Sequence, residues 1–302
     1  MSSVNQTPAI LAEIVEHKRL EVERAKSLLS FAELRGRALA EPPPRELAAA
    51  VRRGPADRTS VIAEIKRMSP SKGLIRAEIK RMSPSAGLIR PEYAGEGFLP
   101  EGIAQRYHAC GASAISCLTD EKFFGGHLSY IERVRLACPL PVLRKDFLID
   151  PWQVWESRAA GADAVLLIAE CLPGGELEAL LEPALALGMS VLVEVHDREN
   201  LERVLPVVEG RERVLLGVNS RDLRTMRVDL GHAMALAALV ADRSSFVAES
   251  GIRTPHDLAR LREAGVRIAL VGEHLMRQSD PGLALRALFG GAGADETLPD
   301  PC

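Results

Sequence analysis

Lysine is scarce in this sequence, and several common signatures are missing altogether. The chain of 302 residues has seven lysines among its 38 basic residues, so arginine is its default surface cation. Three of the lysines, Lys66, Lys80 and Lys145, each stand at the end of a strand-like run. Because arginine does not give up its proton in proteins, this placement indicates a task such as proton transfer.

Other absences exclude whole classes of protein. No run of about 20 apolar residues exists that could span a bilayer, and residues 1–19 lack the basic and apolar regions of a secretory signal. The five cysteines are scattered and form no CxxC, which favours reduced thiols in a cytoplasm over disulfides or a zinc site. The net charge of −3 gives no reason to expect nucleic acid or a membrane surface as a partner.

The order of segments predicts the architecture. Residues 9–39 have the spacing of one amphipathic helix, Glu41-Pro-Pro-Pro44 ends it, and a short helix follows at 45–53. Strand-like and helical segments then alternate. The strand-like runs are continuous and apolar, as in parallel strands buried on both faces, and lie at 60–66, 113–119, 141–147, 162–168, 189–195, 214–219, 244–250 and 267–272. Helical patterns lie near 101–110, 127–137, 151–160, 174–187, 197–207, 229–240, 255–264 and 281–289.

Eight such units in series favour an α/β fold of the (β/α)8 TIM barrel type. An open doubly wound sheet is the alternative, but it rarely runs through eight units and no GxGxxG is present. We therefore expect an N-terminal helical extension over 1–55, a barrel catalytic domain over 56–290 and a disordered tail over 291–302.

One segment of the sequence is repeated. Residues 63–76, AEIKRMSPSKGLIR, recur at 77–90 as AEIKRMSPSAGLIR, with only Lys72 and Ala86 differing. A single repeat of this length is too short for a solenoid, so we interpret it as a local tandem duplication.

Charged residues gather where the predicted strands end, which is where barrel active sites lie. Because strand side chains alternate, Ile62, Glu64 and Lys66 share one face. Five charges aimed at one cavity would be costly unless they pair with one another or hold a ligand. These five are Glu64, Lys66, Lys145, Glu194 and Glu249.

The last two strands carry the signs of a phosphate site. They end in Glu249-Ser-Gly-Ile252 and Val271-Gly-Glu-His274, where small residues let backbone N–H groups approach an anion. Glu273 would repel a phosphate unless its side chain points away. His196 has no second His or Cys at ligand spacing, so we expect a structural or rim residue and no metal. Phe147 could belong to the core or stack on a substrate ring.

Taken together, these segments resemble the indole-3-glycerol phosphate synthase family of tryptophan biosynthesis, over about residues 10–290. The motifs that carry the resemblance are VIAEIKRMSPS, LTDEKFFGG, PVLRKDF, LVEVHD, GVNSRDL, ESGIRTP and VGEHLM. The resemblance implies a cofactor-free decarboxylating and dehydrating ring closure of 1-(2-carboxyphenylamino)-1-deoxyribulose 5-phosphate. It implies a phosphorylated small molecule as the ligand, and we expect a cytoplasmic monomer or weak homo-oligomer.

The resemblance also implies residue roles. Lys145 would protonate the ribulose carbonyl oxygen, and Lys66 would contact the substrate carboxylate and assist dehydration. Glu194 and Glu64 would act as bases or orient the lysines. The remaining substrate and phosphate contacts would come from Asn219, Arg221, Glu249, Phe147, Ser69, Ser250, Gly251, Gly272 and Glu273. A lysine in a cationic, partly desolvated site is expected to have a lowered pKa.

The family has one AEIKR segment where this chain has two, so one copy must be chosen for strand 1. The first copy places Ile62 in the barrel interior below Glu64, whereas the second would place Arg76 there below Glu78. An unpaired buried arginine costs several kcal/mol. We therefore predict that the first copy forms the strand and that the second adds 14 residues to the following loop.

Three other functions stay open at this point. Phosphoribosylanthranilate isomerase is expected to use a Cys and Asp pair and lacks the N-terminal helices. A tryptophan synthase α subunit would need neither Lys66 nor Lys145. A barrel impaired by the duplication would bind a phosphate ligand without turning it over.

Overall fold

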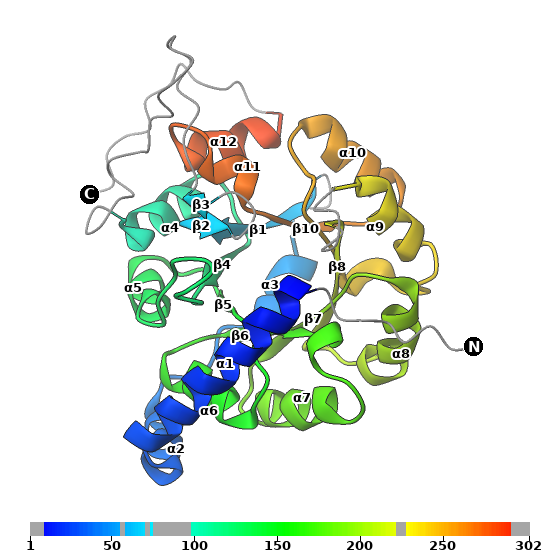
Figure 1. The fold of residues 1–302 in the computed structure, drawn as a ribbon. Coiled ribbons are helices and arrows are strands. Elements are labelled where there is room, and N and C mark those ends of the chain that lie inside the picture. Colours follow the sequence, from blue (N-terminus) through cyan, green and yellow to red (C-terminus); the bar gives the residue numbers. More distant parts are fainter. Residues whose placement is uncertain (1–8, 55–57, 70–72, 75–97, 222–227, 291–302) are drawn as a thin grey trace.

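Eight parallel strands close into a barrel, which confirms the predicted (β/α)8 fold. The computed structural model describes residues 9–54, 58–69, 73–74, 98–221 and 228–290 (Figure 1). The predicted tail and the second copy of the repeat lie outside these residues. Around the barrel the strands run in the order β1-β10-β9-β8-β7-β6-β5-β4.

The strands coincide with the predicted runs to within a few residues at each end. They are β1 (Ser60–Ile65), β4 (Ala114–Leu118), β5 (Val142–Lys145), β6 (Ala164–Ile168), β7 (Ser190–Val195), β8 (Val214–Asn219), β9 (Phe246–Glu249) and β10 (Ile268–Val271). An antiparallel pair, β2 (Met68–Ser69) and β3 (Gly73–Leu74), follows β1.

Helices surround the barrel (Figure 1). In chain order they are α4 (Pro100–Ala109), α5 (Tyr130–Ala137), α6 (Pro151–Ala159), α7 (Glu176–Ala186), α8 (Arg198–Val208), α9 (Leu230–Ala237), α10 (Pro255–Glu263) and α12 (Pro281–Leu288). Short additions are η3 (Ala169–Cys171), η4 (Arg243–Ser245) and α11 (Glu273–Met276). Gly161 and Gly188 end α6 and α7 with φ of 85° and 77°, the left-handed conformation that glycine adopts without strain. Among the described residues no helix is both long and apolar enough to cross a membrane.

The extension contains three helices, because the stretch predicted as one helix is broken. α1 (Ala9–Leu28) ends before Ser30, and α2 (Phe31–Ala40) starts after it. Ser30 has an extended backbone and its hydroxyl accepts a hydrogen bond from Glu33 N, while the Glu33 carboxylate accepts from Ser30 N. This capping box starts a new helix. The prediction of a continuous helix over 9–39 was therefore wrong, although the Ser-x-x-Glu signal is present in the sequence.

The third helix, α3 (Leu47–Arg52), closes the end of the barrel at which the strands begin. Leu47 and Val51 pack into the interior cluster that contains Ile62 of β1. Ala48 N donates a hydrogen bond to Ser190 Oγ at the start of β7. The helix therefore fills the end of the barrel at which the strands begin.

Candidate active site

A cavity of about 820 Å³ lies where the barrel strands end. Charged side chains from the strand ends line its floor, as predicted from the strand-end pattern. Ile10, Leu11 and Ile14 of α1 line it from the extension, so the N-terminal helix forms part of the cavity wall. This position of α1 was not predicted from the sequence.

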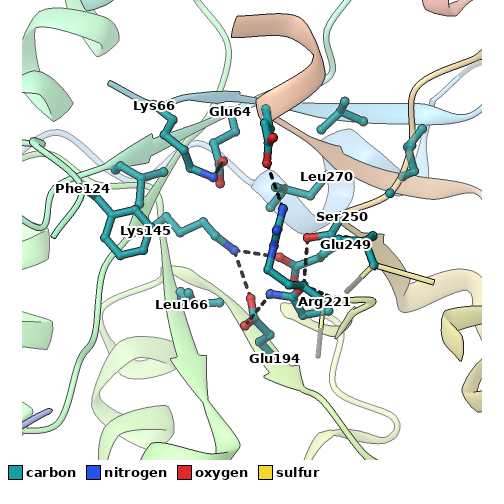
Figure 2. A pocket seen from close by; sticks show the side chains of 18 of the residues that line it. Glu64, Lys66, Phe124, Lys145, Leu166, Glu194, Arg221, Glu249, Ser250 and Leu270 are labelled. Carbon is teal, nitrogen blue, oxygen red and sulfur yellow. Dashed lines mark hydrogen bonds and ion pairs between the residues drawn. The ribbon is translucent and has the colours of Figure 1, made fainter. Parts of the chain in front are cut away.

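Lys145, the last residue of β5, stands at the centre of the charged group. Its Nζ lies 2.7 Å from Glu249 Oε2 and 3.0 Å from Glu194 Oε2; both carboxylates are buried, and the Lys145 side chain is 14% exposed. Figure 2 shows Lys145 reaching between these two carboxylates, which come from β9 and β7. The predicted convergence of strand-end charges is therefore present in the structure.

The first copy of the repeat forms β1, as the alternation argument predicted. Ile62 is fully buried inside the barrel, and Glu64 lies above it with 2% of its surface exposed. Lys66 forms an ion pair with Glu64. Gly272, at the end of β10, is required by this arrangement, because a Cβ there would lie 2.8 Å from Glu64 Cβ.

Asn219 and its neighbours form a hydrogen-bonded group beside Glu194. Asn219 Nδ2 donates to Glu194 Oε1 at 3.3 Å, and Ser250 Oγ donates to Asn219 Oδ1 at 2.8 Å. Arg221 lies 2.9 Å from Glu273, which Arg277 also approaches at 3.2 Å. Glu273 thus faces the cavity instead of pointing away, and two guanidinium groups neutralise it.

The remaining predicted residues are placed as follows. Phe147 lines the cavity, with its ring centroid 6.0 Å from that of Phe124. Ser250 and Gly251 have φ of 65° and 84°, so the chain turns sharply after β9. Ser69 lies in β2, and its side chain is outside the part of the chain that the structure describes.

The charge of Lys145 follows from its neighbours. Burial alone would lower the pKa of Lys145, but the carboxylates of Glu194, Glu249 and Glu64 outweigh burial and raise it above the ordinary lysine value. The expectation of a lowered lysine pKa was therefore wrong, because three carboxylates surround the ammonium. Lys145 is held protonated, which is the state required of a proton donor.

The pKa values of the two carboxyl groups beside Lys145 are shifted in opposite directions. Burial would raise the pKa of Glu194, but Lys145 and His196 outweigh burial and hold it well below its ordinary value. Burial and the charge of Glu194 raise the pKa of Glu249. A pair of carboxyl groups separated in this way can divide the roles of proton acceptor and proton donor.

His196 was predicted to be a structural or rim residue. Its side chain is only 12% exposed and lies between Glu170 and Glu194, so the structure favours the first of these two alternatives. Among the described residues, no group of three or more His, Cys, Asp or Glu side chains is arranged to hold a metal ion.

The fold and this lysine–carboxylate cavity are those of an acid–base enzyme of the (β/α)8 class. The chain belongs to the indole-3-glycerol phosphate synthase family, whose pattern it matches over residues 11–78 and 75–288. The two matched stretches overlap at residues 75–78, where the copies of the repeat meet.

Individual relatives agree with this family. The chain is 46% identical over 285 residues to an indole-3-glycerol phosphate synthase of Azoarcus sp. (strain BH72), covering 93% of this chain and 99% of the relative. It is 45% identical to that of Acidithiobacillus ferrooxidans, covering 93% and 98%. Among solved structures, a 3-hexulose-6-phosphate synthase matches with a TM-score of 0.54 at 17% identity, covering 76% of this chain and 98% of that one. At that identity the likeness concerns the fold alone.

Proposed function

We propose that this chain converts 1-(2-carboxyphenylamino)-1-deoxyribulose 5-phosphate to indole-3-glycerol phosphate, CO2 and water. The observation that carries the proposal is Lys145 held between Glu194 and Glu249 in a buried cavity. The aromatic ring carbon bonds to the ribulose carbonyl carbon while the carbonyl oxygen takes a proton. The carboxyl group then leaves as CO2. The former carbonyl oxygen takes a second proton and leaves as water, while the adjacent CH2 gives up a proton so that the ring double bond forms. Each step needs proton donors and acceptors shielded from solvent.

The lysines are assigned the acid roles in this scheme. Lys145, protonated among carboxylates, donates to the ribulose carbonyl oxygen. Lys66, whose side chain is 17% exposed, binds the substrate carboxylate and assists the departure of water. Glu194, the more acidic carboxyl group, accepts a proton, while Glu64 orients Lys66.

The other residues are assigned to binding. Phe147 packs against the anthranilate ring, and Asn219, Arg221 and Glu249 position the ribulose chain. The phosphate is bound by the segments that follow β9 and β10 and by the loop after β1, which contain Ser69, Ser250, Gly251, Gly272 and Glu273. Paired with Arg221 and Arg277, Glu273 places no net negative charge beside that group.

Gly272→Ala is expected to lower kcat/KM by about 10²-fold, as a displacement of catalytic groups by about 1 Å can. The added methyl group would collide with Glu64 and shift the Glu64–Lys66 pair. Steady-state kinetics measure the loss, and urea unfolding checks that the fold survives. Gly102→Ala is the matched control, because its new Cβ would meet only Leu99 at 4.0 Å. Equal losses in the two variants would contradict the assignment.

The proposed reaction is tested by the gain of indole fluorescence when the substrate is added to purified protein. The isomerase and the α subunit act on other substrates, and a non-catalytic barrel gives no signal. A variant lacking residues 77–90 is measured alongside, so that an impairment caused by the duplication is recognised by its recovery. If folded protein of both forms gives no fluorescence, the proposal is wrong.

We also propose that the enzyme is cytoplasmic and is a monomer or weak homo-oligomer. The helical extension is proposed to end at residue 55 and the barrel at residue 290. Cys110, Cys117, Cys138 and Cys171 are free thiols, and Cys117 is fully buried, which supports a reducing compartment. Sedimentation at several concentrations tests the oligomeric state.

A further inference from the structure

Glu170 and His196 form a buried pair immediately behind Glu194. Glu170 lies in η3, just after β6, and His196 follows β7. One carboxylate oxygen of Glu170 accepts a hydrogen bond from His196 N at 2.8 Å, and the other lies 3.2 Å from His196 Nδ1. Both side chains are 12% exposed. Glu170 therefore bonds the backbone of His196 and lies within ion-pair distance of its ring.

The far side of the imidazole faces Glu194. His196 Nε2 lies 3.5 Å from Glu194 Oε1, and Lys145 contacts Oε2 of the same carboxylate. Asn219 also donates to Oε1. Glu194 is thus held from both ends: one oxygen faces the amide and the imidazole, and the other faces the ammonium.

The charges next to His196 favour a cationic imidazole. Three carboxyl groups, Glu170, Glu194 and Glu249, lie around it together with the ammonium group of Lys145. Buried charges need partners of opposite sign. A protonated His196 supplies a second cation, between Glu170 and Glu194.

The carboxyl groups around His196 favour its protonated form. Burial alone would lower the pKa of His196, but Glu170, Glu194 and Glu249 outweigh burial and raise it to about 9. Asp197 caps α8 through Asn200 N. Arg203 of α8 donates to Ala169 O and Leu172 O, and the ring of His232 of α9 lies 2.7 Å from the His196 carbonyl oxygen.

We propose that His196 is a positioning residue, clamped by Glu170, that holds Glu194 ionised and oriented for proton transfer. The assignment rests on the proposed function, in which Glu194 accepts a proton. A neutral imidazole in the same place would leave Glu194 with Lys145 as its one cationic contact, so that a proton would bind Glu194 more readily. Glu170 acts through His196 and touches neither Glu194 nor Lys145.

The first test follows the His196 ring by NMR in ¹⁵N-histidine-labelled protein and needs no turnover. Glu170→Gln keeps the shape of the side chain and removes its charge, so the His196 titration should move to lower pH by about one unit or more, the usual effect of losing an adjacent charge. Glu121→Gln is the matched control: Glu121 lies 3.5 Å from His127 in a pair whose side chains are about half exposed or more, and its loss should leave His196 unchanged. An unmoved His196 in Glu170→Gln overturns the clamp.

The second test is the pH profile of kcat/KM. In His196→Gln the acid limb of the profile, on which Glu194 takes up a proton, should move to higher pH by about one unit or more. In Glu170→Gln the alkaline limb should move to lower pH than in the wild type, because His196 then loses its proton at a lower pH. Adding Glu170→Gln to His196→Gln should change nothing further, because Glu170 acts through the imidazole. An acid limb that coincides with the wild type in folded His196→Gln overturns the positioning role. A wild type without turnover would defeat the proposed function instead, and the NMR result would still decide whether Glu170 holds His196.

Discussion

Lys66→Ala is expected to lower kcat by about 10²- to 10⁴-fold, the usual contribution of a positioned general acid. Lys80→Ala is expected to change kcat only slightly. The two lysines occupy the same position in the two copies of the repeat, so the chain supplies its own matched control for residue type and local sequence. Lys66 lines the cavity and pairs with Glu64, which is why its loss should be the damaging one.

The physical reason for this asymmetry lies two residues before the Glu of each copy, Glu64 and Glu78. The first copy presents Ile62, which is fully buried inside the barrel. For the second copy to replace it, Arg76 would have to enter that apolar interior at a cost of several kcal/mol. The sequence AEIK itself is the same in both copies, and the residue before it decides which one can form β1.

Steady-state kinetics of both variants, with and without residues 77–90, complete the comparison. Lys66→Ala should remain inactive in the shortened chain, which contains one copy of the repeat. If Lys80→Ala were inactive and Lys66→Ala active in the full chain, the second copy would be the one that works in solution. Equal partial losses would mean that the two copies share the strand.

The barrel could be predicted from sequence because its determinants are local. Continuous apolar runs, their alternation with helical segments and the glycines that end helices such as α6 and α7 can each be recognised within a short window. The strand-end residues Lys145, Glu194 and Glu249 were found for the same reason, since parallel strands bring their carboxyl ends to one face.

The pKa values and the contacts that depend on residues far apart in the chain could not be predicted. The pKa of Lys145 was expected to be lowered, but the sequence does not show that three carboxylates surround the ammonium. Glu170 was not singled out, because nothing in η3 indicates that it reaches His196. The same holds for the position of α1, whose partners are far away in the chain.

A buried ionic contact between α1 and the barrel is made by Lys18. It is 3% exposed, and its Nζ lies 3.0 Å from Asp146 and 3.1 Å from Asp120. Asp146 follows Lys145 directly, and its other oxygen is 3.1 Å from Arg144. Its Oδ1 also accepts the backbone N–H of Phe147. The extension is thus attached to the strand end that carries Lys145.

Lys18→Met is expected to destabilise the protein by about 3–5 kcal/mol, the effect of removing one partner from a buried ionic group. Methionine fills a similar volume, but it leaves Asp120 and Asp146 close together with one cation fewer. Urea unfolding measures the change. Lys26→Met is the control on the same helix, because Lys26 pairs with Asp150 at 2.6 Å with both side chains about one third exposed. Such surface pairs contribute about 1 kcal/mol or less.

The pH dependence of this loss separates the ionic contribution from simple repacking. Burial alone would raise the pKa of Asp146, but Arg144 and Lys18 outweigh burial and hold it far below its ordinary value. A depressed carboxyl pKa stabilises the fold above the unfolded pKa of about 4, and that stability is lost as the pH falls through the folded value. Without Lys18 the pKa of Asp146 is lowered less. The difference in the free energy of unfolding between the wild type and Lys18→Met should therefore be largest near neutral pH and decrease as the pH falls into the acid range. A gap that stays constant with pH, or one no larger than that of Lys26→Met, would mean that α1 is held by its apolar contacts instead.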